Sequence, residues 1–196
     1  MTTDETPASE AFRKLRMEIF VDGTNFRITQ LEAGIRDLDI PRFARQLARG
    51  YILVKMRYYT SPLPDQSSVA YRGQQRFFKR LRATSAVDLV LGRNEPRRES
   101  VACPACGTLS VHRQHVEKET DVNLAVDMTV GAHTGRYDIA VLVAGDTDYV
   151  RAIQAAQATG REVLWCHFPA QSYTDRLRQV CDGEVLLDEK FLRTCR

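Results

Sequence analysis

Three short acidic clusters contain the residues of this chain that are best suited to chemistry. The clusters are Val21-Asp22-Gly23-Thr24-Asn25, Glu119-Thr120-Asp121 and Gly145-Asp146-Thr147-Asp148. The first and third follow apolar runs typical of strands, so their carboxylates would lie where a strand ends. Carboxylates held close together repel one another and raise one another's pKa unless they share a proton or bind a cation. The clusters therefore predict a site for a divalent metal ion.

The predicted ion is Mg2+ or Mn2+, because carboxylate oxygens suit these cations and leave positions open for water and phosphate. Such an ion lowers the pKa of a bound water and stabilises charge on a reacting phosphate, alone or as one of a pair. The predicted metal ligands and catalytic residues are Asp22, Asp121, Asp146 and Asp148. The predicted hydrogen-bonding residues beside them are Thr24, Asn25 and Thr147.

Each acid also has a simpler structural explanation. Asp146 and Asp148 could cap a helix, Asp22 could begin a turn, and Asp121 could complement a helix dipole. The metal interpretation is favoured because all of these acids fall at the predicted reactive edge of one sheet. Three other acids lack such a position and are interpreted as surface or capping residues. These are Glu119, Asp127 and Asp138.

The elements that must position the acids alternate between strand and helix. The expected strands are Glu18–Val21, Ile52–Tyr59, Val87–Leu91, Asp138–Ala144 and Glu162–Phe168, and the expected helices are Arg42–Arg49, Gln66–Arg82, Asp121–Val130 and Thr147–Thr159. Alternation of this kind predicts an α/β fold with a central parallel five-stranded sheet between helices. In such sheets the reactive groups collect at the carboxyl ends of the strands, where the winding reverses. The acids meet there if the first and fourth strands are neighbours.

Length and composition predict a single domain. The chain has 196 residues, of which 43% are hydrophobic, and its formal net charge is +3. Residues 1–10 are polar and acidic, so we expect a disordered tail over residues 1–14 followed by one domain over residues 15–196. The tail lacks the character of a secretion signal, and no apolar run is long enough to cross a membrane. We therefore expect a cytoplasmic protein with reduced cysteines.

The three acidic motifs together resemble the NYN domain of the PIN-like nuclease superfamily, in particular its LabA-like bacterial group. The matching segments are Phe20–Asn25, Glu117–Asp127 and Val143–Tyr149, and the resemblance covers about residues 17 to 170. It implies a Rossmann-like three-layer α/β/α fold and metal-dependent cleavage of RNA at Asp22, Asp121, Asp146 and Asp148. Such proteins usually read Lys-Gly-Val-Asp where this chain has Lys118-Glu119-Thr120-Asp121. Glu119 thus replaces a glycine just before one of the acids.

A second feature is Cys103-Pro104-Ala105-Cys106-Gly107, a knuckle that can direct two thiolates at one zinc ion. His112 and His115 could complete the site, although their spacing is shorter than usual. Cysteines elsewhere or a second protomer, in a homodimer, are alternative sources of ligands. The alternative donors within the chain are Cys166, Cys181 and Cys195. The prediction is an inserted arm over residues 94–116, held by structural zinc or, failing that, a metal-free hairpin.

Arginines at helical spacing predict a basic helix face that contacts the RNA backbone. The residues are Arg72, Arg76 and Arg80, next to Lys79, with Arg93, Arg97, Arg98 and Arg113 on the arm. The predicted function is a divalent-metal-dependent endoribonuclease. The alternative is a non-catalytic module on the same fold that binds RNA or protein. A haloacid dehalogenase-type phosphatase is disfavoured, because Phe20 stands where its nucleophilic aspartate should be.

Overall fold

The computed structural model describes residues 14–102, 104–169 and 175–196, with the backbone alone at His112. Its main sheet has six parallel strands in the order β3-β2-β1-β6-β7-β8. The strands are β1 (Arg16–Asp22), β2 (Ile52–Thr60), β3 (Val87–Leu91), β6 (Ile139–Val143), β7 (Glu162–His167) and β8 (Gly183–Leu186). The order reverses between β1 and β6, which pair from Met17 with Ile139 to Val21 with Val143. The predicted contact between the first and fourth of the expected strands is therefore confirmed.

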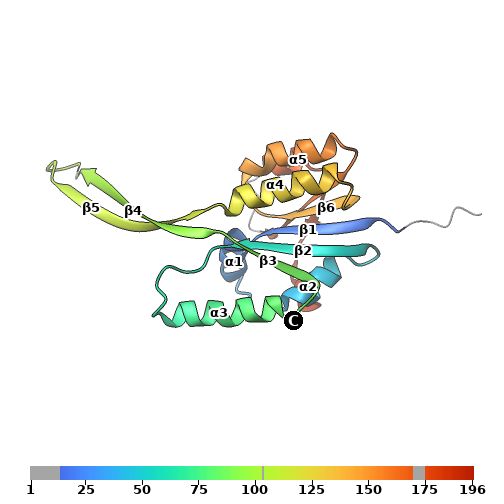
Figure 1. The fold of residues 1–196 in the computed structure, drawn as a ribbon, viewed down its shortest axis with the longest axis horizontal. Coiled ribbons are helices and arrows are strands. Elements are labelled where there is room, and N and C mark those ends of the chain that lie inside the picture. Colours follow the sequence, from blue (N-terminus) through green and yellow to red (C-terminus); the bar gives the residue numbers. More distant parts are fainter. Residues whose placement is uncertain (1–13, 103, 170–174) are drawn as a thin grey trace, which may run out of the picture.

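Helices cover both faces of the sheet and make three layers (Figure 1). One face is covered by α1 (Gly23–Glu32), α2 (Ile40–Leu47) and α3 (Val69–Arg82), and the other by α4 (Thr120–His133) and α5 (Val150–Gln157). A 3-10 turn (η1, Thr147–Tyr149) precedes α5, and α6 (Asp175–Val180) and α7 (Glu189–Arg193) complete the chain. The core is correspondingly split in two. Phe26, Phe43 and Leu81 pack on the first face, and Leu124, Met128 and Ile153 on the second.

The prediction of five strands was wrong by one, and three helices were missed, namely α1, α6 and α7. The additional strand β8 has only four residues, and it has no run of apolar residues to mark it. Helix α1 lacks an amphipathic stripe, since Thr29 and Gln30 are among the residues it buries. Strand β8 and helix α1 are therefore stabilised by tertiary packing rather than by a strong local sequence pattern.

Capping explains most of the helix boundaries. The Asp39 carboxylate caps α2 as expected, and the Ser68 hydroxyl caps α3, which begins three residues later than predicted. Helix α4 begins at Thr120, one residue before the start of the helix expected over Asp121–Val130. The preceding residue, Glu119, has a left-handed φ of 77° and makes no side-chain capping bond. Gly160 has a φ of 77° after α5, which is the left-handed turn expected there.

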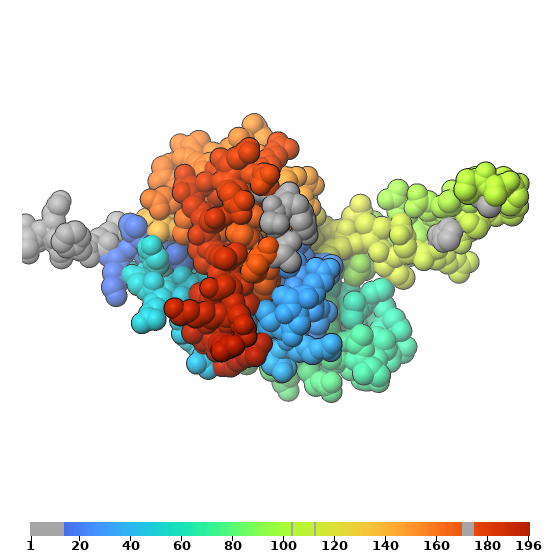
Figure 2. Space-filling view, turned by 180° about the vertical axis from the view of Figure 1, so that it is seen from behind, coloured from blue at the N-terminus to red at the C-terminus, as the bar shows by residue number. Residues whose placement is uncertain are grey.

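A two-stranded antiparallel ribbon leaves the body between β3 and α4. It consists of β4 (Arg93–Ala102) and β5 (Leu109–Lys118), which pair along their whole length. The ribbon stands clear of the body in both overall views (Figures 1 and 2). The ribbon contains the segment predicted as an arm, residues 94–116, and extends slightly beyond it at both ends. Apart from Lys14, the predicted disordered tail lies outside the described residues.

No helix among the described residues is both long enough and apolar enough to pass through a membrane.

Candidate active site

A pocket of about 220 Å³ lies at the carboxyl edge of the sheet, beside the reversal between β1 and β6. Its lining residues are Asp22, Thr24, Asn25, Ile28, Glu117, Thr120, Asp121 and Asp146. The structure thus brings together three of the four predicted acids and two of the predicted hydrogen-bonding residues. They come from the end of β1, the first turn of α1, the start of α4 and the loop after β6.

Asp22 is fixed by the local structure around the first turn of α1. Its Oδ1 accepts a hydrogen bond from the Asn25 backbone N–H at 3.0 Å, so Asp22 caps this helix, whereas the simpler explanation had given it only a turn. The Asn25 Oδ1 in turn accepts from the Gly145 N–H at 3.0 Å, which ties the loop after β6 to α1. Only glycine fits at position 23, because a Cβ there would lie 2.2 Å from Tyr58 Cε1. Capping uses one carboxylate oxygen of Asp22 and leaves the other for the pocket.

The hydroxyl of Tyr149 connects two of the acids. It donates to Asp22 Oδ2 at 3.2 Å and to Asp121 Oδ1 at 3.0 Å, and a single proton serves one carboxylate at a time. The Tyr149 ring is buried. Burial, together with the nearby charges of Asp22 and Asp121, raises the pKa of this phenol, so it remains a donor. Tyr149 therefore holds carboxylates from two distant parts of the chain beside each other.

Glu117, near the end of β5, is a pocket residue that the sequence reasoning did not select. Its Oε2 accepts from the Thr24 hydroxyl at 2.8 Å, whereas its Oε1 is buried and has no hydrogen-bond partner among the described residues. A buried, unsatisfied carboxylate oxygen is costly unless a ligand completes it. The signal in the sequence was its position four residues before Asp121, within the second acidic motif.

The pocket gathers carboxylates that no cationic side chain of the described residues neutralises. Burial is the main cause that raises the pKa of Asp22 to about 6, and the charges of Asp121 and Glu117 raise it further. The hydrogen bonds from Asn25 and Tyr149 act in the opposite direction. In the described part of the chain, no lysine, arginine or histidine forms an ion pair with Asp22, Asp121, Asp146 or Glu117.

The donor set fits a hard divalent cation. Mg2+ and Mn2+ take oxygen ligands, and the unsatisfied Glu117 Oε1 is such an oxygen. Across the residues described, no three acidic, histidine or cysteine side chains are already spaced to hold an ion. Binding would therefore require the carboxylates to move closer together around the cation.

Two of the predicted residues lie outside the pocket lining. Asp146 Oδ1 accepts from the Asp148 backbone N–H at 3.0 Å, so Asp146 caps the η1 turn. Asp148 is exposed and Thr147 is half-buried. The structure therefore brings Asp146 to the pocket and leaves Asp148 and Thr147 on its margin.

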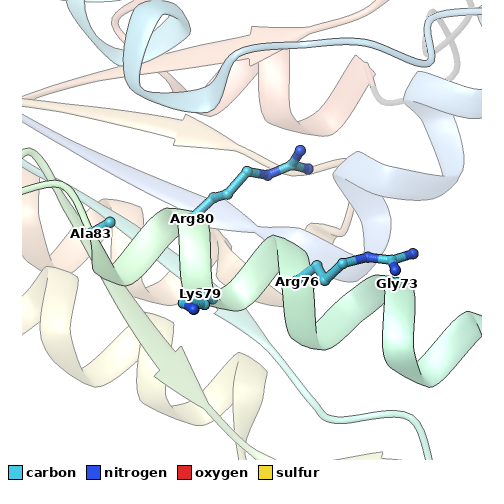
Figure 3. Close-up of a pocket in the computed structure, with 5 residues that line it drawn as sticks. All are labelled: Gly73, Arg76, Lys79, Arg80 and Ala83. Atoms are coloured by element: carbon cyan, nitrogen blue, oxygen red, sulfur yellow. The ribbon is translucent and has the colours of Figure 1, made fainter.

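The predicted basic residues of α3 lie in a separate place. Arg76, Lys79 and Arg80 line a second hollow of about 590 Å³ with Gly73 and Ala83 (Figure 3). Figure 3 shows Arg76 and Arg80 extending from the same side of the helix. The Arg72 guanidinium donates to the Ser67 carbonyl at 2.7 Å. These cations therefore form a surface distinct from the acidic pocket.

The predicted zinc ligands are not gathered in the described residues. Cys103 and the side chain of His112 lie outside them. Cys106 is exposed in the turn between the strands, with its thiol 3.2 Å from the Thr108 hydroxyl. His115 pairs with Pro96, six register positions from the Ala102–Leu109 pair that closes the ribbon. At about 3.4 Å per residue, His115 lies roughly 20 Å down the strand, too far to share an ion with Cys106.

Other residues have structural roles. Trp165 and Cys166 are buried, as expected, and the Trp165 ring stacks on His167 at 3.9 Å between centroids. Two acids interpreted as surface or capping residues instead join partly buried networks. The Asp127 carboxylate accepts from the Tyr59 hydroxyl at 2.9 Å, and Asp138 forms an ion pair with Arg16 at 2.8 Å.

The fold and site define a class of protein. Helices on both faces of a mostly parallel sheet, with an acidic pocket at its carboxyl edge, fit the PIN-like α/β fold. The family model of the NYN domain matches residues 16–188, so the chain belongs to the NYN domain family. NYN domains are generally nuclease-like domains of the ribonuclease type.

One solved structure, of a protein of unknown function from Vibrio parahaemolyticus, resembles this chain with a TM-score of 0.67. The two share 22% sequence identity, and the match covers 94% of this chain and 99% of the other. At this identity the similarity supports the fold alone. No curated protein matches the sequence.

Proposed function

We propose that this protein is a divalent-metal-dependent endoribonuclease that hydrolyses RNA phosphodiester bonds at the acidic pocket. The observation that carries the proposal is the unneutralised set of carboxylates, in which one phenol bridges two acids and a third, Glu117, has an unsatisfied oxygen. Membership of the NYN family makes RNA the expected substrate. Carboxylates that lack a cation partner within the protein suit a cation from solvent.

In this proposal Asp22, Asp121, Asp146 and Glu117 hold Mg2+ or Mn2+. When bound, the ion would lower the pKa of a water and offset charge on the phosphate. Asp148 lies outside the pocket lining, so it would orient water or substrate without binding the ion directly. Thr24 and Asn25 hold Glu117 and the loop after β6 in place through the hydrogen bonds described above. Thr147 would contact substrate at the same edge.

The basic hollow on α3 belongs to the same proposal as a contact for the RNA backbone. Arg76 and Arg80 present guanidinium groups that can each bind a phosphate through two parallel hydrogen bonds. Arg72 would contribute from the first turns of the helix. Because this hollow is separate from the pocket, its arginines would hold RNA at a distance from the bond that is cleaved.

The test is cleavage of a mixed cellular RNA by the wild type and by Asp146→Asn, in Mg2+, in Mn2+ and in a chelator. We expect cleavage to require the metal ion and to fall about a hundredfold or more in the variant, since a charged ligand is lost. Glu162→Gln is the matched control, because Glu162 is exposed at the amino end of β7 on the opposite edge of the sheet. Full activity of a well-folded Asp146→Asn protein, or cleavage that persists in chelator, would contradict the proposal.

The alternative is a non-catalytic RNA-binding module on the same fold. It is favoured by one observation: no three potential ligands among the described side chains are spaced for an ion. The same assay separates the two functions. Salt-sensitive RNA binding without cleavage in Mn2+ would establish the alternative, because phosphate contacts need cationic side chains rather than carboxylates.

Structural zinc at the tip of the ribbon remains a second, smaller proposal. Since His115 is too far from Cys106, the remaining ligands would come from a second protomer in a homodimer. Zinc content of protein purified without added metal, measured for the wild type and Cys106→Ser, tests this. His133→Gln serves as the control, because His133 ends α4 in the body and is not among the predicted zinc ligands. Equal zinc content in the wild type and Cys106→Ser would dismiss the proposal.

A further inference from the structure

The two faces of the β4–β5 ribbon differ in how closely their arginines lie to acids. Residues that pair across an antiparallel ribbon lie on the same face, and successive pairs alternate between faces. The face that carries Glu117 consists of the pairs Asn94–Glu117, Pro96–His115, Arg98–Arg113, Ser100–Val111 and Ala102–Leu109. We call it the pocket-side face, because Glu117 lines the acidic pocket. Glu117 is its only acid.

Arg98 and Arg113 are direct cross-strand partners on the pocket-side face. Both are exposed, and neither has a hydrogen-bond or ion-pair partner among the described residues. Like charges placed directly opposite each other destabilise a strand pair. This cost is not offset within the described chain, so the pair suits an anionic ligand.

The opposite face of the ribbon carries three cations, Arg93, Arg97 and Lys118, and two acids, Glu95 and Glu99, and its acids lie beside its arginines. Arg93 forms an ion pair with Glu95 at 2.8 Å, and Glu99 accepts a hydrogen bond from Gln114 at 3.3 Å. Arg97, one of the predicted RNA contacts, lies on this face opposite Gln114 and between these two acids along β4, so it belongs to the face turned from the proposed RNA path. The contrast shows that the arginine pair is specific to one face and does not simply reflect a basic ribbon.

The arginine pair lies on the path that leads out of the acidic pocket. Arg113 is four residues from Glu117, which corresponds to about 14 Å along an extended strand. A polymer with one phosphodiester at the pocket could therefore reach the pair with a neighbouring phosphate. Each guanidinium presents a planar fork that matches phosphate oxygens.

We infer that the pocket-side face of the ribbon binds the backbone of single-stranded RNA through Arg98 and Arg113 and leads it to the acidic pocket. The inference rests on the proposed nuclease function and extends it to the form of the substrate. A single strand fits better than a duplex, because its flexible backbone can follow the ribbon from the arginine pair into the pocket at the end of the sheet. The ribbon stands clear of the body, so RNA can reach this face (Figure 2).

The first experiment measures binding without cleavage, so it does not depend on nuclease activity. A fluorescent single-stranded RNA of about 20 nucleotides is titrated in chelator with the wild type, with the double variant Arg98→Ala/Arg113→Ala and with Arg97→Ala. We expect about tenfold weaker binding by the double variant, and a salt dependence smaller by about 1.4, or about 0.7 for each lost phosphate contact on a single strand. Arg97→Ala should remain within about twofold of the wild type.

The outcomes separate this inference from the proposed function. If the wild type binds RNA through the arginine pair but does not cleave it in Mn2+, the nuclease proposal fails and the binding face stands. Unchanged binding by the double variant, an equal loss in Arg97→Ala, or equal affinity for duplex RNA would each overturn the inference.

A second experiment compares cleavage of a four-nucleotide RNA, which fills little more than the pocket, with cleavage of the longer strand. The double variant should cleave the short RNA at the wild-type rate and the long RNA more slowly at low substrate concentration. An equal loss on both lengths would also overturn the inference, since it would indicate damage to the pocket itself.

Discussion

Strand β1 carries two carboxylates four residues apart, and they differ in whether cationic side chains surround them. Glu18, in the middle of the strand, is fully buried and accepts hydrogen bonds from Arg57 Nε and Arg136 Nε, each at 2.6 Å. Asp22, at the end of the strand, has no described cation partner and faces the charges of Asp121 and Glu117. One acid is fully neutralised by the protein, and the other is crowded by further acids.

The contrast extends beyond β1. At the amino edge of the sheet, Asp138 pairs with Arg16 and with Arg161 at 3.4 Å. In the part of the chain that the structure describes, arginines thus pair with the buried acids Glu18 and Asp138, and none pairs with an acid of the pocket. The absence is local, and it is the arrangement expected if solvent supplies the neutralising charge as a metal ion.

Replacing the carboxylate by an amide should have opposite effects on stability at Glu18 and at Asp22. Glu18→Gln removes the charge but keeps the shape, and it leaves two partly buried guanidiniums without their counter-ion. Removing one partner of a buried ion pair destabilises strongly, and we expect the free energy of unfolding to fall by about 3 kcal/mol. Urea unfolding at pH 7.5 measures this change.

Asp22→Asn should stabilise the metal-free protein at pH 7.5. The pKa of Asp22 is raised from 3.8 to about 6 in the folded state, so its proton is bound more tightly there than in the unfolded chain. The folded wild type is therefore favoured below pH 3.8 and loses stability as pH rises from about 3.8 to 6. Above this range the ionised carboxyl costs at most about 3 kcal/mol, which asparagine does not incur.

Unfolding of Asp22→Asn and wild type in chelator, at pH 3.5 and pH 7.5, checks this prediction. The variant should be more stable at pH 7.5 and equal to the wild type at pH 3.5. Added Mg2+ should stabilise the wild type and leave the variant less affected, because the ion binds the folded carboxylates. If Asp22→Asn and Glu18→Gln both destabilise at pH 7.5, the distinction between the two acids is lost.

The arginine partners of the neutralised acid Glu18 were harder to predict from sequence than the positions of the pocket acids. The positions of Asp22 and Asp146 followed from apolar runs that end in a carboxylate, which is a local pattern. The partners of Glu18 did not follow, because they depend on sheet register and on where Arg136 returns after α4. Glu117 was missed for a similar reason, since its approach to Thr24 depends on how the ribbon rejoins the body.

The basic residues show the same limit. Helical spacing correctly predicted that Arg76 and Arg80 share an exposed side of α3, but it did not show that they line a hollow separate from the acids. The face of the ribbon that carries Arg98 and Arg113 likewise depends on the β4–β5 register, which the sequence does not specify. Local patterns predicted which residues are exposed or charged, and tertiary structure decided what they face.

Glu119 provides the smallest and most specific test of the division between neutralised and crowded acids. It lies two residues before Asp121, yet its carboxylate pairs with Arg93 Nε at 2.5 Å, so it belongs with the structural acids. It also occupies the position that is glycine in the sequences this chain resembles, with a φ of 77° that favours glycine.

Two substitutions separate the backbone of Glu119 from its charge. Glu119→Ala and Glu119→Gly both remove the exposed ion pair, which contributes about 1 kcal/mol or less. Only glycine relieves the left-handed strain, so we expect Glu119→Gly to exceed Glu119→Ala in unfolding free energy by about 1 kcal/mol. Both variants should cleave RNA within about twofold of the wild-type rate, because Arg93 already neutralises this acid. A large loss of cleavage in both variants would instead place Glu119 among the pocket acids, and the presence of an arginine partner would no longer separate structural acids from catalytic ones.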